Sequence, residues 1–197
     1  MALGRPRAFD IDTALNRALE VFWSKGFDGA SLTDLTEAMG ISRPSLYAAF
    51  GNKEDLFRKA LDRYKTEKMA YINEALAAPT ARTLAERLLF GAATMLTDPS
   101  HPVGCLSVKG AMTCKDDSLI AREELDQLRC SFETAIIERL TRAIADGDLP
   151  PDSNPLVLQR FLGTVAMGMS LQASQGATAA DLMAVARMAL TAWPALR

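Results

Sequence analysis

Residues 31–53 read SLTDLTEAMGISRPSLYAAFGNK and carry the local signals for two short helices joined by a tight turn. Ser31, with an acidic side chain three residues later, has the pattern of a capping box and predicts the start of the first helix. Gly40 predicts the end of that helix, because glycine accepts the left-handed backbone that closes helices. Ser42 caps the second helix, and Pro44 lies in the first turn, where its missing N–H is no loss.

Two short helices around such a turn form a helix-turn-helix, in which the second helix enters the major groove of DNA. Leu46 and Phe50 have the spacing of buried residues in the second helix. Arg43, Ser45 and Tyr47 are then left on its outer face, where a guanidinium and two hydroxyls can reach phosphates and base edges. This stretch therefore predicts a nucleic-acid-binding element.

Outward from this stretch, apolar residues recur at helical spacing along nearly the whole chain, and no window shows the sustained alternation of a strand. Glycine, proline and acidic breakers divide the pattern. The sequence therefore predicts an all-α, two-domain architecture, a small head on a larger helical bundle. We expect nine helices, at 11–25, 32–39, 43–50, 53–77, 81–97, 103–114, 118–146, 155–175 and 178–193.

Composition is that of a folded globular protein, with 49% hydrophobic and 23% charged residues among 197. Net charge gives no support to DNA binding: it is -2 for the chain, and residues 1–60 contain eight basic and eight acidic residues, which cancel to zero. The prediction of DNA binding therefore depends on where the basic residues lie, and not on the net charge. Neither a secretory signal nor a run of apolar residues long enough to span a membrane is found, so we expect a cytoplasmic protein.

The three cysteines and the one histidine have no metal-ligand spacing. We expect free thiols, no metal and no cofactor.

Three segments carry a resemblance to the TetR family of transcriptional regulators: GRPR at 4–7, ALEVFWSKGFDGASL at 18–32 and MGISRPSLYAAFGNKEDLF at 39–57. The specific match covers roughly residues 4 to 62. The remainder agrees only in length and in number of helices.

The resemblance implies a function for each part of the chain. Residues 1–52 would be a DNA-binding head, and residues 53–197 would be a body that binds a small molecule and dimerises. The protein would be a homodimeric repressor that a small-molecule inducer releases from a palindromic operator by a rigid-body movement of the two heads.

The resemblance also implies individual DNA contacts. Tyr47 and Lys53 would contact phosphates, the latter together with the N-terminus of the helix that it begins. Arg5 and Arg7 would extend toward a groove or the flanking backbone. The residues placed at the DNA surface are Thr33, Arg43, Pro44, Ser45 and Tyr47.

For the ligand, we expect a cavity among the helices of the body. Aromatic and methionine side chains suit such a cavity, although a stripe of this kind is also typical of plain core. Cys105 opens a predicted helix, where the helix dipole favours a reactive thiolate. It is either a sensor of electrophiles or a wall residue of the cavity. The other candidate lining residues are Phe90, Met95, Met112, Phe132 and Met167.

Small residues at three- and four-residue spacing form a stripe in the predicted helix 155–175: Gly163, Ala166, Ser170 and Ala173. The family reading assigns this stripe to a dimer interface with the last helix, which would match the two-fold symmetry of a palindromic operator. The alternative is close packing within one subunit.

Two other classes of function remain open on the residues alone. One is a thiol-dependent, all-helical enzyme that uses Cys105, although the single histidine, His101, precedes a proline and no paired carboxylates suggest a general base. The other is a helical scaffold that does not bind DNA. The outward-facing Arg43, Tyr47 and Lys53 argue against it. Activation of transcription, instead of repression, is also left open.

Overall fold

The structure is a computed structural model that describes residues 9–113 and 119–194, with 111–113 as backbone only. Within these residues the chain forms ten α-helices and one short π-helical segment, and no strand. The elements are α1 (Ile11–Gly29), α2 (Leu32–Met39), α3 (Arg43–Phe50), α4 (Lys53–Arg63), η1 (Tyr64–Lys68), α5 (Ala70–Leu76), α6 (Ala81–Thr97), α7 (Leu106–Thr113), α8 (Leu119–Ala145), α9 (Pro155–Ser174) and α10 (Ala179–Thr191).

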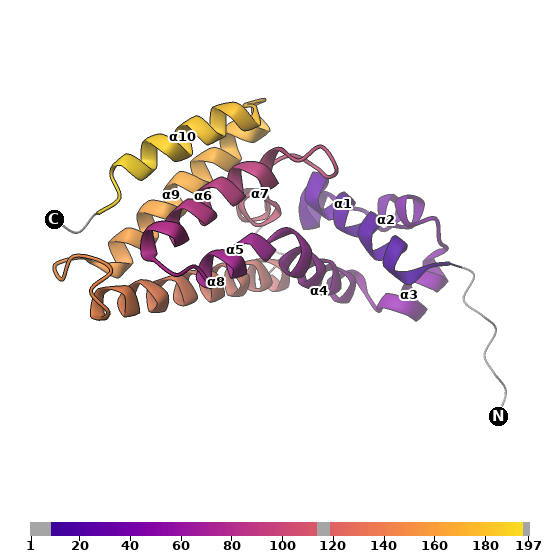
Figure 1. Ribbon diagram of the computed structural model, residues 1–197. Coiled ribbons are helices and arrows are strands. Elements are labelled where there is room, and N and C mark those ends of the chain that lie inside the picture. Colours follow the sequence, from indigo (N-terminus) through magenta and orange to yellow (C-terminus); the bar gives the residue numbers. More distant parts are fainter. Residues whose placement is uncertain (1–8, 114–118, 195–197) are drawn as a thin grey trace.

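Figure 1 shows α1, α2 and α3 gathered at one end of an elongated molecule, while α5, α6, α8, α9 and α10 form the other end. Helix α4 connects the two. The division of the chain into a head and a body thus agrees with the arrangement of the helices, although α4 also packs against α1.

Aromatic packing joins α4 to the head. The ring of Phe57 makes edge contacts with Phe22 and Phe27 of α1, with centroids 5.1 Å and 5.2 Å apart. Gly26 lies between these two partners at φ 72°, and this left-handed residue bends α1 so that its last turn can reach α4. The head is thereby fixed on the helix that leads into the body.

The predicted helix over 53–77 is interrupted, which raises the number of α-helices to ten. Residues Tyr64–Lys68 adopt a π-helical turn, and Met69 (φ -99°, ψ 10°) separates it from α5. A π turn adds residues without a breaker such as proline, so hydrophobic spacing alone did not reveal it. It changes the register between α4, which faces the head, and α5, which faces the body.

Helix α6 is the centre of the body and packs against α5, α9 and α10. Its buried face alternates leucine with alanine, and the alanines allow neighbouring helices to approach closely. The long helix α8 closes one side by packing against α7 and α9. An interior lined by five different elements results.

Candidate nucleic-acid interface and interior cavity

The predicted caps of the helix-turn-helix are present. The N–H of Asp34 donates to Ser31 Oγ, and its carboxylate accepts from the Ser31 N–H, each at 3.0 Å. Gly40 ends α2 with φ 66° and ψ 32°, and the Ile41 N–H donates to the Thr36 carbonyl. The Ser31 bonds fix the start of α2, while the Gly40 conformation and the Ile41 bond form the turn into α3.

The outer face of α3 carries the predicted DNA-contacting side chains. Leu46 and Phe50 are buried, whereas Arg43, Pro44 and Tyr47 are exposed, Tyr47 to 50%. The Tyr47 hydroxyl is therefore accessible to a partner outside the head.

A single hydrogen bond ties the start of α3 to that of α2. Arg43 Nη2 donates to Thr33 Oγ1 at 2.9 Å, and both side chains are exposed. Ser45, whose N–H and hydroxyl interact with Ser42 Oγ, lies partly exposed in the same turn. Thr33, Arg43 and Ser45 thus form one polar surface at the N-termini of two helices.

Lys53 begins α4 directly after α3 ends, and its Nζ lies 4.3 Å from the centroid of the Phe27 ring. Partial burial lowers the pKa of this ammonium, while the charges of Asp28 and Glu54 oppose the shift. The ammonium of Lys53 therefore lies against the head, over the Phe27 ring. Arg5 and Arg7 lie outside the described residues.

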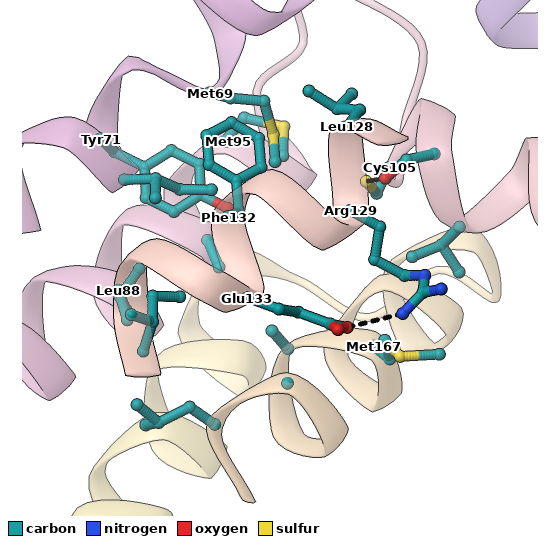
Figure 2. Close-up of a pocket in the computed structure, with 18 of the residues that line it drawn as sticks. Met69, Tyr71, Leu88, Met95, Cys105, Leu128, Arg129, Phe132, Glu133 and Met167 are labelled. Atoms are coloured by element: carbon teal, nitrogen blue, oxygen red, sulfur yellow. Dashed lines mark hydrogen bonds and ion pairs between the residues drawn. The ribbon is translucent and has the colours of Figure 1, made fainter. Parts of the chain in front are cut away.

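The body contains a cavity of about 300 Å³ between α5, α6, α8 and α9, with the start of α7 as a further wall. Four of the predicted lining residues are in its wall: Met95, Cys105, Phe132 and Met167. Figure 2 shows them around a common interior, with Phe132 near Tyr71 and Met167 near an ion pair at the edge.

Two predicted lining residues are not found in this wall. Phe90 lies on α6 but borders a separate outer groove with Glu86, Arg87 and Thr94, so its assignment to the cavity is wrong. It points there because it is five residues before Met95, which places it about 140° around the helix from that inward-facing side chain. The side chain of Met112 lies outside the described residues.

Polar groups are few in the cavity wall and fall into two classes. Neutral groups come from Tyr71, Cys105, Ser107 and Gln159. The charged group is at the edge, where Arg129 pairs with Glu133 at 2.9 Å and with Asp126 at 3.3 Å (Figure 2). The side chains of this charged trio remain 36–54% exposed, so the described charges belong to the rim and not to the interior.

Cys105 lies directly before α7 and is buried. Its sulfur is 3.1 Å from Tyr64 Oη and 3.0 Å from Ser107 Oγ, and its N–H donates to Ser170 Oγ at 3.0 Å. Burial raises the pKa of Tyr64 well above its usual value, so the phenol is a neutral partner of the thiol. An electrophile would have to enter the cavity to reach this sulfur.

A junction that the sequence did not reveal connects the cavity wall to the head. Trp23 Nε1 of α1 donates to the Gly104 carbonyl at 3.1 Å, across 81 residues. The indole also stacks on His101 at 4.3 Å and meets the Tyr64 ring edge-on at 4.8 Å. His101, for which we expected no function, is thus part of this interface, and residue 104 immediately precedes the cavity residue Cys105.

The stripe of small residues on α9 faces inward. Ser170 and Ala173 are 4% and 2% exposed in a single chain, and Gly163 and Ala166 line the cavity. The assignment of Ser170 and Ala173 to a dimer surface is therefore wrong, since their neighbours within the chain already cover them. The outer faces of α9 and α10 instead expose large apolar side chains, among them Val157, Leu171 and Met188.

Over the described ranges, no cluster of three or more His, Cys, Asp or Glu side chains could hold a metal ion. None of the described helices has the length and apolar character needed to cross a membrane.

The geometry agrees with comparisons against known proteins. The family model for bacterial regulatory proteins of the tetR family matches residues 14–60. The transcriptional repressor ComR of Escherichia coli (strain K12) is 36% identical over 196 residues, which cover 98% of this chain and 93% of that protein. The repressor BdcR of the same organism is 32% identical over 188 residues, 94% of this chain and 90% of that protein.

Solved structures show the same relationship. A cysteine variant of the TetR family regulator CifR, in complex with 26-base-pair operator DNA, superposes with a TM-score of 0.90 and 46% identity. The match covers 96% of this chain and all of that one. The similarity therefore extends through the body, beyond the helix-turn-helix.

Proposed function

The chain belongs to the TetR family of bacterial regulatory proteins, and from this premise we propose that it is a homodimeric transcriptional repressor that a small molecule releases from its operator. The observation that carries the proposal is the exposed outer face of α3, held by capped helices in a chain similar over nearly its full length to repressors. Repression is favoured over activation because the relatives ComR and BdcR are both transcriptional repressors. The protein would act in the cytoplasm, on chromosomal DNA.

For DNA recognition, we assign base-edge contacts to Arg43 and Ser45 and phosphate contacts to Tyr47 and Lys53. Thr33 would hold the Arg43 guanidinium in position, since the two are already hydrogen-bonded. Pro44 would contribute apolar surface at the start of α3. In a dimer, the two α3 helices would lie about 34–36 Å apart and read a palindrome.

For dimerisation, we assign the outer faces of α9 and α10. Leu171 is 46% exposed and Met188 is 71% exposed, and apolar surface of this size on adjacent helices is typical of an isologous interface. The predicted pair of helices is retained, and only the face that they present is revised.

For the inducer, the cavity between α5, α6, α8 and α9 is the candidate site. A ligand can shift the DNA-binding equilibrium only through its different affinities for the two states, and tens-fold induction needs about 2 kcal/mol of such coupling. The rival function of a thiol enzyme lacks support from the geometry, since the described neighbours of the Cys105 sulfur are two neutral hydroxyls and no general base.

A gel-shift titration on the duplex upstream of the protein's own gene tests this function. We expect a dissociation constant of about 10 nM or tighter and at least about thousandfold weaker binding to a scrambled duplex. Equal affinity for both duplexes would contradict operator recognition, and no binding to either would favour the scaffold.

A further inference from the structure

Two polar side chains in the cavity wall have no hydrogen-bond partner among the residues that the structure describes: the hydroxyl of the partly buried Tyr71 and the carboxamide of the buried Gln159. Gln159 is only 7% exposed. Neither group is completely sealed by protein atoms: among the described residues, the buried side-chain nitrogen or oxygen without a partner is Trp193 Nε1. A ligand that fills the cavity must therefore offer hydrogen bonds to Tyr71 and Gln159, because a polar group that is buried without a partner is costly. These two groups therefore point to a partner that enters the cavity.

The position of Tyr71 depends on a glycine of the facing helix. A Cβ added at Gly91 would come within 2.6 Å of the Tyr71 ring, so only glycine lets the ring lie against α6. From there the side chain extends toward Phe132 (Figure 2). Burial, together with the nearby Cys105 thiol, raises the pKa of Tyr71, so the hydroxyl stays protonated and can donate.

The other neutral polar groups of the wall already bond to one another. The Cys105 thiol lies between the hydroxyls of Tyr64 and Ser107, and the Cys105 N–H donates to Ser170. Among these described neutral groups, only Tyr71 and Gln159 make no hydrogen bond within the protein.

Charge sets a second condition on the ligand. The described interior offers no ionised group, since Asp126, Arg129 and Glu133 form ion pairs at the exposed rim. A carboxylate or an ammonium inside would be buried without a counter-charge, which costs far more than burying a neutral polar group. The remaining wall is leucine, isoleucine, methionine and aromatic surface, which favours an apolar body.

We propose that this cavity takes an uncharged, largely apolar molecule with a carbonyl oxygen, and that Tyr71 and Gln159 determine this specificity by donating hydrogen bonds to it. The inference rests on the proposed ligand-controlled function, whose inducer site it specifies.

The test is calorimetric titration of the full-length protein, without DNA, with three matched series of roughly six to twelve carbons. The series are linear methyl ketones, the alkenes in which a methylene replaces the carbonyl oxygen, and the carboxylates of equal length. At the length that binds best, we expect the ketone to bind about tenfold or more tightly than its alkene and its carboxylate.

Two substitutions assign that preference to the named residues. Tyr71→Phe and Gln159→Leu should each weaken ketone binding about fivefold or more while leaving the alkene nearly unchanged. The matched control is Gln172→Leu, the same change at an exposed position of the same helix, which should keep the full preference.

The outcomes separate this inference from the function on which it rests. A parent protein that binds no ketone better than its alkene, or a preference that survives both substitutions, overturns the inference. Ketone binding with the expected preference supports the inference, whether or not the ketone releases the operator. If the bound ketone does not release the operator, that failure counts against ligand control and not against the inference. If a molecule releases the operator and its affinity is unchanged by both substitutions, ligand control is supported, and the assignment of Tyr71 and Gln159 is overturned.

Discussion

At the scale of single residues, we expect Arg43 to contribute sequence specificity and Lys53 to contribute affinity for any DNA sequence. Arg43 lies at the start of α3, bonded to Thr33, where its guanidinium can reach a base edge. We expect Arg43→Ala to reduce the preference for operator over random duplex by about tenfold, the range of one lost bidentate base contact. The measurement is competitive gel shift on both duplexes.

Lys53 should behave differently. Replacement by methionine keeps a long unbranched side chain next to the Phe27 ring but removes the ammonium, and with it both the charge and the contact of Nζ with the ring. Lys53→Met should weaken binding to operator and random DNA by a similar factor and lower the slope of log affinity against log salt by about one. If Arg43→Ala and Lys53→Met each reduced the affinity for operator and random DNA equally, this difference in role between the two residues would be contradicted.

Asp34 gives the head a defined response to acid. Its hydrogen bond with Lys25, at 2.5 Å, and those with Ser31 hold the pKa of this carboxyl well below its usual range. A depressed pKa means that the ionised carboxylate stabilises the fold above its unfolded pKa, about 3.9, and loses this effect as the pH falls further. Asp34→Asn should therefore lower the melting temperature at pH 7, and the difference from the parent should narrow below about pH 4. A difference that is constant across this range would show that the ionised form is not responsible.

Cys105 distinguishes covalent from reversible induction. The sulfur lies on the cavity wall and bonds to two hydroxyls, so serine should fit with little disturbance. We expect Cys105→Ser to keep DNA affinity within about twofold and still to be released by an electrophile that releases the parent, as a wall residue would allow. Loss of release by electrophiles alone, measured by gel shift, would instead identify the thiol as the trigger.

At the scale of elements, helix positions were predictable where local signals set them. Ser31, Gly40 and Ser42 fixed the ends of α2 and α3, because caps and left-handed glycines act over three or four residues. The π turn at Tyr64 has no such signal. The sequence also has no local signal for the partner of the small-residue stripe on α9, since small residues suit an intramolecular and an intermolecular contact equally well. Trp23 and Gly104 meet only through the tertiary fold, so their hydrogen bond was beyond any local pattern.

The revised face of α9 and α10 can be tested at the same scale. Met188→Glu places a carboxylate in the proposed interface, and two-fold symmetry places it there twice. An unpaired buried charge costs about 3 kcal/mol or more, so sedimentation at micromolar concentration should show a shift toward monomer. Arg187→Gln, at an exposed neighbouring position on α10, is the control because it makes the net charge more negative by the same single unit. A dimer unaffected by Met188→Glu would place the interface elsewhere.

At the scale of the whole molecule, two kinds of contact join the head to the body. On one side, Arg63 of α4 bonds to the Asp12 carbonyl and to Asn16 of α1. These bonds keep the head on α4. On the other side, the Trp23 indole rests on the segment that leads into the cavity wall. A ligand that displaces this wall must therefore either move α1 or break the Trp23 hydrogen bond.

This arrangement predicts that Trp23 carries part of the coupling between ligand and DNA. Trp23→Phe keeps an aromatic ring near His101 and Tyr64 but removes the N–H that donates to Gly104. Such a hydrogen bond contributes about 1 kcal/mol, so the ratio of operator affinities without and with inducer should fall about fivefold. The matched control is Trp193→Phe, because the buried Trp193 Nε1 has no hydrogen-bond partner in the described part of the chain and the change removes a similar volume. The measurement is operator binding by fluorescence anisotropy across inducer concentrations. If both variants reduced the ratio equally, lost packing and not the hydrogen bond would account for the effect, and the cavity would have to act on the head through the π turn and α4.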